Sequence, residues 1–230
     1  MRVLAIGAHS DDMDGYCGGT LALYAQQGHT VGIACMTDGR AYGNVSPVEE
    51  LVATRKREFE QSASLIGASQ TFWLGFSNGR LQRSNAAQQV LEDLFIQFKP
   101  DVLITHPADD YHPEHMTTHH LVIDASVKTF FGNNLVTTIL FCESEGGFNF
   151  IPDEYVDITP VFDLKLEMMN VHHSQYDWGP DPVTGKVENS LVDSTIDLAR
   201  FHGYQAMVKY AEVFQLCRKY GRMRTYRVLP

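Results

Sequence analysis

The sequence has few of the features that mark secreted or membrane-spanning proteins. Its 230 residues include only four cysteines, and none of them forms a Cys-x-x-Cys pair, so we expect neither a zinc ribbon nor a redox dithiol. Scattered, reduced thiols are the default in the cytoplasm. No apolar run of about 18 residues occurs, and the apolar stretch before His9 is too short for a signal peptide. These absences favour a cytoplasmic protein with no membrane-inserted segment.

Basic residues are also scarce. The chain has 18 Lys and Arg against 28 Asp and Glu, and its formal net charge is −10. Nucleic-acid binding needs a basic surface, so we expect no nucleic-acid partner. The 44% hydrophobic and 20% charged content is ordinary for a globular protein. The length suits one α/β domain with a full hydrophobic core, and we predict a single domain over residues 1–230.

Strands and helices alternate over roughly the first two thirds of the chain. The patterns predict strands at 2–8, 30–39, 70–76, 101–106 and 137–144, and helices at 18–29, 47–67, 86–98 and 113–131. Such alternation is typical of a mostly parallel sheet with right-handed crossovers. We therefore predict an α/β fold with helices on both faces of a sheet of strand order 3-2-1-4-5.

The pattern loosens after residue 145. We expect helices at 160–175 and 194–203, with a Pro/Gly-rich loop at 176–189 between them. No internal repeat and no linker divides the chain, so this last third is interpreted as an addition to the same domain.

Two polar clusters lie just past predicted strands. Ala-His-Ser-Asp-Asp (8–12) follows the first strand, and His-Pro-Ala-Asp-Asp-Tyr-His-Pro-Glu-His (106–115) follows the fourth. Ligand sites in doubly wound sheets lie at the carboxyl ends of the strands, at the point where the strand order reverses. The predicted order makes these two strands neighbours, so we expect the clusters to meet.

The combined clusters suit a divalent metal ion. His9, Asp12 and His115 would make a two-histidine, one-carboxylate site, which fits zinc or another first-row metal and leaves a position open for water. Asp11 could take a proton from that water, and His112 could give one to a leaving amine.

Other interpretations of these residues remain open. His119 and His120 compete with His115 for the role of ligand, and spacing alone does not decide between them. An Asp-Asp pair is most often a turn or a helix N-cap. The Gly-Gly-Thr at 18–20 lacks both a G-x-G-x-x-G pattern and a Walker lysine, so we expect it to let a helix pack close to the sheet rather than to bind phosphate.

A resemblance to a known family joins these features. AIGAHSDDMDGYCGGTLALYAQQGHTVGIACMTDG (5–39) resembles the opening of the LmbE-like, or PIG-L, deacetylases, whose signature is A-H-P-D-D-x-E followed by G-G-T. Further similar segments are, in order, TRKREFEQSASLIGA, LGFSNGRL, KPDVLITHPADDYHPEH, KLEMMNVHHSQ and KYAEVF. Together they span nearly the whole chain. The resemblance implies a Rossmann-like three-layer α/β/α fold and the zinc-dependent removal of acetyl from N-acetylglucosamine-type amino sugars.

The resemblance also assigns roles to single residues. It implies His9, Asp12 and His115 as metal ligands, Asp11 as general base, and His112 as the group that acts as general acid or steadies the oxyanion. It implies a substrate-binding role for Arg55, although an Arg-x-x-Glu pair on a helix is equally well explained by an intrahelical salt bridge. We add Tyr111 as a second candidate to bind substrate and stabilise the oxyanion.

The chain departs from the family signature at two positions. Ser10 replaces the family's proline, which loosens the turn or adds a hydrogen bond, and Asp14 replaces its glutamate, which shortens the reach of a supporting carboxylate. Neither change removes an inferred ligand, so they affect the expected substrate rather than the expected chemistry.

Candidate sugar contacts lie in predicted loops. Tyr42, Tyr176 and Trp178 could supply a flat apolar face, and Asp181, Glu188 and Asn189 could supply polar contacts. His172, Ser174 and Gln175 are interpreted as structural support.

The sequence therefore predicts a metal-dependent hydrolase that acts on a small amino-sugar derivative. The ion is expected to be Zn²⁺, with Fe²⁺ or another divalent metal possible. The family resemblance also implies a homo-oligomer. Two alternatives stay open: an amidase acting on a non-sugar N-acyl compound, and a catalytically silent module that binds metal or sugar.

Overall fold

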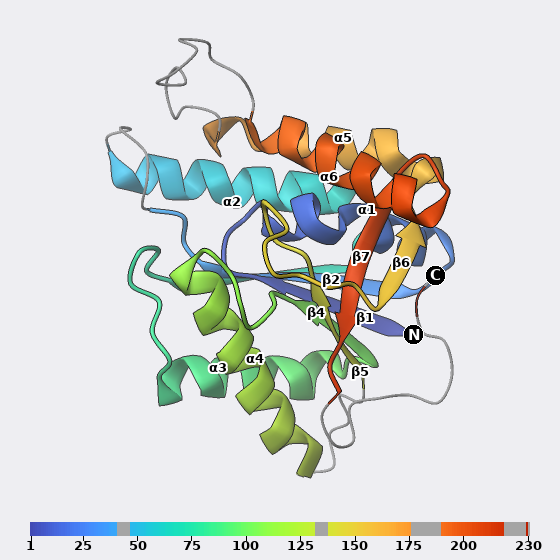
Figure 1. Ribbon diagram of the computed structural model, residues 1–230. Helices are drawn as coiled ribbons and strands as arrows, with labels where there is room; N and C mark the ends of the chain where they lie inside the picture. Colours follow the sequence, from blue (N-terminus) through green and yellow to red (C-terminus); the bar gives the residue numbers. More distant parts are fainter. Residues whose placement is uncertain (41–46, 132–137, 176–189, 219–228, 230) are drawn as a thin grey trace.

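The computed structural model describes residues 1–40, 47–131, 138–175, 190–218 and 229. Within these ranges, seven strands form one sheet in the order β3-β2-β1-β4-β5-β7-β6 (Figure 1). The strands are β1 (Arg2–Gly7), β2 (Thr30–Thr37), β3 (Gln70–Phe76), β4 (Val102–Thr105), β5 (Thr138–Cys142), β6 (Glu154–Asp157) and β7 (Ala211–Leu216). The strands from β3 to β5 are parallel, whereas β7 is antiparallel to both β5 and β6. The predicted α/β fold and the order 3-2-1-4-5 are confirmed.

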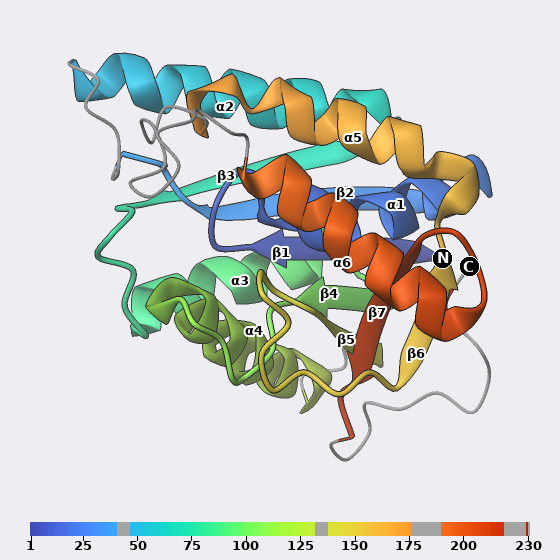
Figure 2. The same ribbon diagram turned by 45° about the horizontal axis from the view of Figure 1, so that its top comes forward.

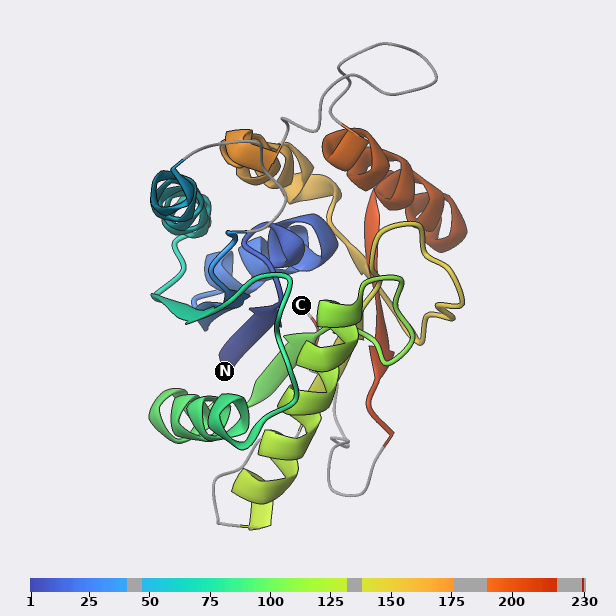
Figure 3. The same ribbon diagram turned by 90° about the vertical axis from the view of Figure 1, so that its left-hand side faces the viewer.

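Helices cover both faces of the sheet. They are α1 (Asp12–Gln26), α2 (Val48–Leu65), α3 (Asn85–Phe98), α4 (Pro113–Phe131), α5 (Phe162–Val171) and α6 (Ser190–Ala206), with short 3₁₀ helices η1 (Thr159–Val161) and η2 (His173–Gln175). One face carries α1, α2, α5 and α6, and the other carries α3 and α4 (Figure 3). Helices α2 and α5 lie side by side (Figure 2).

The central strand shows why the chain needs both layers. Residues 3–7 of β1 are all buried. Val3 and Ala5 belong to the core under α1, whereas Leu4 and Ile6 belong to the core under α3 and α4. Successive side chains of a strand point to opposite faces, so a fully apolar strand requires helices on both sides.

Helix α1 begins six residues earlier than predicted. It starts at Asp12, where the Gly15 N–H donates to the Asp11 carbonyl at 3.0 Å. Asp12 and Asp14 lie in its first turn, where carboxylates interact favourably with the helix dipole. The backbone then leaves helical geometry at Cys17, with φ −146° and ψ 15°. The apolar pattern begins only after this break, and for that reason it located only the second part of the helix.

The last third of the chain differs most from the prediction. The helix predicted at 160–175 is divided into η1, α5 and η2, and α6 extends beyond 194–203 at both ends. Strands β6 and β7 were not predicted. Only Val156 of the four residues in β6 is buried, so its pattern is too short to recognise, and pairing with β7 defines it as a strand.

Candidate active site

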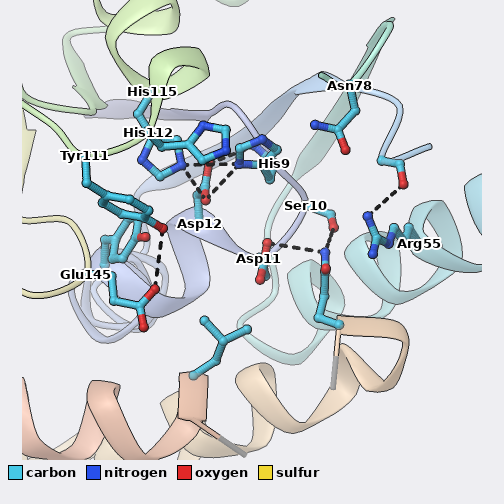
Figure 4. Close-up of a pocket in the computed structure, with 14 residues that line it drawn as sticks. His9, Ser10, Asp11, Asp12, Arg55, Asn78, Tyr111, His112, His115 and Glu145 are labelled. Atoms are coloured by element: carbon cyan, nitrogen blue, oxygen red, sulfur yellow. Dashed lines mark hydrogen bonds and ion pairs between the residues drawn. The ribbon is translucent and has the colours of Figure 1, made fainter. Parts of the chain in front are cut away.

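A cavity of about 320 Å³ lies past the carboxyl ends of β1 and β4 (Figure 4). The residues expected from the sequence to bind the metal, to act in catalysis and, through Arg55 and Tyr111, to bind substrate all line it: His9, Asp11, Asp12, Arg55, Tyr111, His112 and His115. The neighbouring strands bring the two polar clusters together, as the predicted strand order required. Ser10, Tyr16, Gly39, Asn78, Glu145, Gln175 and Leu191 complete the lining.

Three donor atoms in this cavity have the spacing of metal ligands. His9 Nδ1 lies 3.2 Å from His115 Nε2, which lies 3.3 Å from Asp12 Oδ1. The third separation, between His9 Nδ1 and Asp12 Oδ1, is 3.5 Å. Bonds of about 2.0–2.1 Å to a tetrahedral zinc ion place ligand atoms about 3.3–3.4 Å apart. The residues therefore fit a small divalent ion.

In His9 and His115, the ring nitrogen that faces away from the other two donor atoms, here called the outer nitrogen, contacts a carboxylate. His115 Nδ1 lies 3.0 Å from Asp110 Oδ1, and His9 Nε2 lies 3.0 Å from Glu114 Oε2. Each contact fixes a tautomer in which the outer nitrogen carries the proton and the inner nitrogen keeps its lone pair. A second carboxylate in this position is typical of metal-binding histidines.

Glu114 also organises the loop after β3. Its Oε1 accepts hydrogen bonds from the N–H groups of Gly79 and Leu81, both at 2.9 Å, and its Oε2 accepts one from Asn78 Nδ2 at 2.7 Å. These donors and His9 hold the pKa of Glu114 at about 2 in spite of its burial. The side chain that orients His9 is therefore ionised and fixed from several sides.

Nearby histidines are less suited to bind an ion. The sets His9–His112–His115 and Asp12–His106–His115 also place donor atoms close together. However, His106 Nε2 already has two close partners, Asp12 Oδ2 and the Ala8 backbone nitrogen, both at 3.0 Å, and burial lowers the pKa of His106 to about 4. His119 Nδ1 contacts the His106 carbonyl at 2.9 Å, and neither it nor His120 lines the cavity.

Asp12 is the negative centre of the cluster. Burial alone would raise its pKa, but His115, His9 and His106 lower it well below its usual range. Burial also opposes protonation of His9 and His115, yet the Asp12 carboxylate raises their pKa values to about 9 and about 10. The Asp12 carboxylate therefore attracts positive charge to the space between the two rings.

Asp11 has the environment of a base. Burial and the neighbouring charge of Asp12 raise the pKa of its carboxyl group. Gln175 Nε2 donates to Asp11 Oδ1 at 3.4 Å and to Ser10 Oγ at 3.1 Å. Ser10, which replaces the family's proline, thus adds a hydrogen bond next to the base.

His112 presents a hydrogen-bond donor to the cavity. Its Nδ1 accepts the N–H of Glu114 at 3.2 Å, so the proton of the neutral ring is assigned to Nε2. Burial lowers the pKa of His112, and the nearby His9 and His115 lower it further. The neutral ring therefore has a donor available for a substrate oxygen.

Arg55 is a buried cation in the wall of the cavity. Its exposed fraction is 3%, and its Nη1 donates to the Gly39 carbonyl at 2.7 Å. Glu58, the other member of the Arg-x-x-Glu pair, accepts hydrogen bonds from the Ser174 N–H at 3.0 Å and the Ser174 Oγ at 2.5 Å. These two side chains thus have hydrogen-bond partners in different segments of the chain.

Asp14 connects the first turn of α1 to Ser62 and His172. It accepts a hydrogen bond from Ser62 Oγ at 2.5 Å, and its Oδ2 lies 2.6 Å from His172 Nε2. All three side chains are buried. The shorter carboxylate at this position still contacts both α2 and the residue after α5.

Five residues of the lining were missed in the sequence: Tyr16, Gly39, Asn78, Glu145 and Leu191. Tyr16 lies in α1 just before the break at Cys17, whereas Gly39, Asn78 and Glu145 follow β2, β3 and β5. The rule that sites lie past the carboxyl ends of strands would have pointed to these last three. The loop candidates Tyr42, Tyr176, Trp178, Asp181, Glu188 and Asn189 lie outside the described residues.

The helices that the structure describes include none with the length and apolar content needed to span a membrane.

The chain is similar to known deacetylases and has the fold of a hydratase. The chain is 26% identical over 197 residues to a probable N-acetyl-alpha-D-glucosaminyl L-malate deacetylase 2 of Bacillus cereus, covering 82% of this chain and 90% of that protein. The structure of an N,N'-diacetylchitobiose deacetylase from Pyrococcus horikoshii has 27% identity and a TM-score of 0.78, covering 94% of this chain and 83% of that one. A 4-carboxy-2-hydroxymuconate hydratase from Pseudomonas putida has the same fold, with 20% identity, a TM-score of 0.80 and full coverage of both chains.

The family model described as GlcNAc-PI de-N-acetylase, PIG-L, matches residues 4–126. The match covers just over half of the chain and includes both polar clusters and Arg55. The chain therefore belongs to the PIG-L family of deacetylases.

Proposed function

We propose that this protein hydrolyses the N-acetyl group of an N-acetylglucosamine-type amino-sugar derivative and releases acetate. The mutual spacing of 3.2–3.5 Å among His9 Nδ1, Asp12 Oδ1 and His115 Nε2 is the observation that carries this proposal. Two relatives that cover most of the chain are described as deacetylases of such sugars.

His9, Asp12 and His115 would hold the ion, which we propose to be Zn²⁺, with Fe²⁺ or another divalent metal as the alternative. When bound, the ion supplies a Lewis acid that makes water more acidic and polarises an amide carbonyl. The protein's own contribution is the arrangement of Asp11, His112 and Tyr111 around the place where the amide is cleaved.

Asp11 accepts a proton from the water that attacks the amide carbon. Its raised pKa makes it a better base than an ordinary carboxylate, and Gln175 limits its rotation. His112 donates from Nε2 to the oxygen that becomes negative, or passes a proton to the leaving amine. The amine and acetate are the products.

The cavity suits the uncharged, hydroxyl-bearing ring of an amino sugar. Its lining includes the carboxylates of Asp11, Asp12 and Glu145 and one cation, Arg55. Three carboxylates and one arginine have a net charge of −2, and a divalent ion would bring the net charge of the lining to zero. A polycarboxylate of the kind a hydratase takes would add negative charge that nothing in the lining compensates, whereas a sugar would add hydrogen-bonding groups. Arg55, Asn78 and Tyr111 are the proposed contacts.

A substrate panel tests the proposal. Metal content is measured on gently purified protein, and acetate release is then followed for N-acetylglucosamine, N,N'-diacetylchitobiose, an N-acetylglucosaminyl malate, an N-acetylated thiol conjugate and an unsaturated tricarboxylate. Acetate from the sugars alone supports the proposal. Acetate or amine from the thiol conjugate alone favours a non-sugar amidase, and hydration of the tricarboxylate favours a hydratase. If the protein contains metal but converts no substrate of the panel, the result favours a binding module.

A further inference from the structure

A buried ion pair lies against the interrupted helix α1. Lys165 of α5 and Glu212 of β7 have side-chain exposures of 2% and 3%, and Lys165 Nζ lies 2.5 Å from Glu212 Oε1. Both side chains bond to backbone groups of α1, and α1 packs against α5 and β7. Because a buried ion pair stabilises a fold weakly at best, this pair requires a further explanation.

The pair replaces a hydrogen bond of the helix. In an uninterrupted helix, the Gly19 N–H would donate to the Gly15 carbonyl four residues earlier. Here the Gly15 carbonyl accepts from Lys165 Nζ at 2.6 Å, and the Gly19 N–H donates to Glu212 Oε1 at 2.9 Å. The ion pair therefore bridges the two backbone groups across the break at Cys17.

Thr20 completes the arrangement. Its N–H and its hydroxyl both donate to Glu212 Oε2, at 2.7 and 2.6 Å. Gly19 leaves the space that the carboxylate needs, because a Cβ there would lie 3.2 Å from Glu212 Oε1 and 2.8 Å from Ile158 Cγ2. The Gly-Gly-Thr segment thus binds a carboxylate, although this one belongs to the protein itself.

The turn on the other side of the break carries the site. Residues 11–16 include Asp11, Asp12 and Tyr16, which all line the cavity. Asp14 ties this turn to Ser62 and His172, and Lys165 ties the Gly15 carbonyl at its end. We infer that the Lys165–Glu212 pair is a positioning device: by bridging the break in α1, it sets the orientation of this turn and so the places of Asp11 and Asp12 relative to His9 and His115.

Two neighbouring glycines provide a matched test. Gly19→Ala keeps every charge but places a Cβ 3.2 Å from Glu212 Oε1 and 2.8 Å from Ile158 Cγ2, so it crowds the carboxylate and the side chain beside it. A Cβ at Gly18 would instead meet the flexible end of Met168, at 3.3 Å. We expect Gly19→Ala to lower kcat and weaken zinc binding by about 10–100-fold with little change in KM. Gly18→Ala should stay within about twofold of the native protein, since this glycine makes no contact with the ion pair. Equal values for the two variants would overturn the inference.

A double variant separates positioning from stability. Lys165→Met and Glu212→Leu, each alone, leave a buried charge without its partner and should lower Tm. The combined variant removes both charges and should regain much of that loss, as replaced ion pairs often do. We expect its kcat and zinc affinity to stay low, because the helix can then close its own bond between residues 15 and 19. A double variant with regained Tm, native kcat and native zinc affinity would contradict the inference.

The kinetic comparison rests on the proposed function, but the zinc titration does not. If the native protein releases acetate from no substrate in the panel, the proposed function fails and zinc affinity alone decides the positioning role. If either variant fails to fold, the other test decides. A purely structural role would lower stability but would leave kcat and zinc affinity of the folded protein unchanged. A positioning role lowers both in folded protein while KM stays the same.

Discussion

At the scale of single residues, the neighbouring carboxylates of Asp11 and Asp12 have different contacts. Asp12 Oδ2 accepts the N–H of His9 at 2.7 Å, while its Oδ1 faces the two histidine nitrogens. Asp11, one position earlier, faces the cavity from the N-cap position of α1 without capping it by a side-chain hydrogen bond. The turn of the helix between the two positions separates the proposed ligand from the proposed base.

Asp11→Asn tests this division of roles. The amide cannot accept the proton of the attacking water but nearly matches the carboxylate in shape. We expect kcat to fall at least about 10²-fold, the scale of a lost general base, with zinc content unchanged. Asp12→Asn serves as the contrast and should lose zinc. Full activity in Asp11→Asn would remove Asp11 from the mechanism; the checks are acetate release and elemental analysis.

Glu114→Gln tests the outer contact of His9. The carboxylate fixes the His9 ring and accepts three further hydrogen bonds, and an amide cannot accept all of them. We expect zinc affinity to fall by about 10–100-fold, as for other outer carboxylates. Glu49→Gln, on the exposed first turn of α2, is the matched control. Competition titration with a chelator measures both, and equal affinities would argue against the orienting role.

At the scale of elements, helix α3 belongs to the hydrophobic core and contributes no residue to the lining of the cavity. Helix α3 has a capped start, where Ser84 Oγ accepts the N–H of Ala87 at 3.2 Å. The helix packs against α4 and the sheet through Leu91, Phe95 and Phe98, and none of these residues lines the cavity.

Ser84→Ala should therefore destabilise without changing catalysis. Loss of an N-cap costs about 1 kcal/mol, which lowers Tm by about 2–4 °C in a protein of this size. Ser64→Ala, whose hydroxyl is exposed and bonds locally to the Gln61 carbonyl, should change stability by less than about 0.5 kcal/mol. Calorimetry measures the shift, and a changed kcat in Ser84→Ala would show that α3 is coupled to the site.

At the scale of the whole molecule, buried ion pairs connect the C-terminal third to the sheet. His202 of α6 lies 2.6 Å from Glu143, just past β5, and both side chains are buried. Burial alone would lower the pKa of His202, but the hydrogen bonds to Glu143 and Gln205 raise it above its ordinary value. A group with a raised pKa in the folded state stabilises the protein while it is protonated in both states.

This contribution should disappear as pH rises. It is fully present below the ordinary histidine pKa of about 6.5 and is lost as pH rises through the higher folded-state value. We expect the free energy of unfolding of the native protein to exceed that of His202→Gln by about 1.5–3 kcal/mol near pH 6, with a smaller difference near pH 9. Urea unfolding of both proteins across this range measures it, and a difference that grows with pH would contradict the assignment.

Zinc should stabilise the whole fold, because its proposed ligands follow two different strands. The gain from an ion that binds only the folded state is about 2.7 kcal/mol at a free concentration of 100 times Kd. We expect a chelator to lower Tm in the native protein and to have little effect in His115→Ala. An unchanged native Tm on chelation would argue against a metal at this site. The expected homo-oligomer stays a prediction, which light scattering would check.

The sequence by itself determined the strands from β1 to β5, their order and seven of the residues that line the cavity. It could do so because apolar strands and polar strand ends follow local rules, and because the family signature is continuous in the chain. The choice among His115, His119 and His120 as proposed ligand needed the structure, which shows which ring nitrogens face one another and which already have other partners.

Tertiary structure alone decided strands β6 and β7 and the first turn of α1. Strands β6 and β7 are defined by pairing with each other and with β5, and four residues of β6 carry too little pattern to be recognised alone. The break at Cys17 accompanies an ion pair from residues about 150 and 195 positions further along the chain. Local propensity has no information about such partners, because the free energy that favours the break arises only when distant segments pack together.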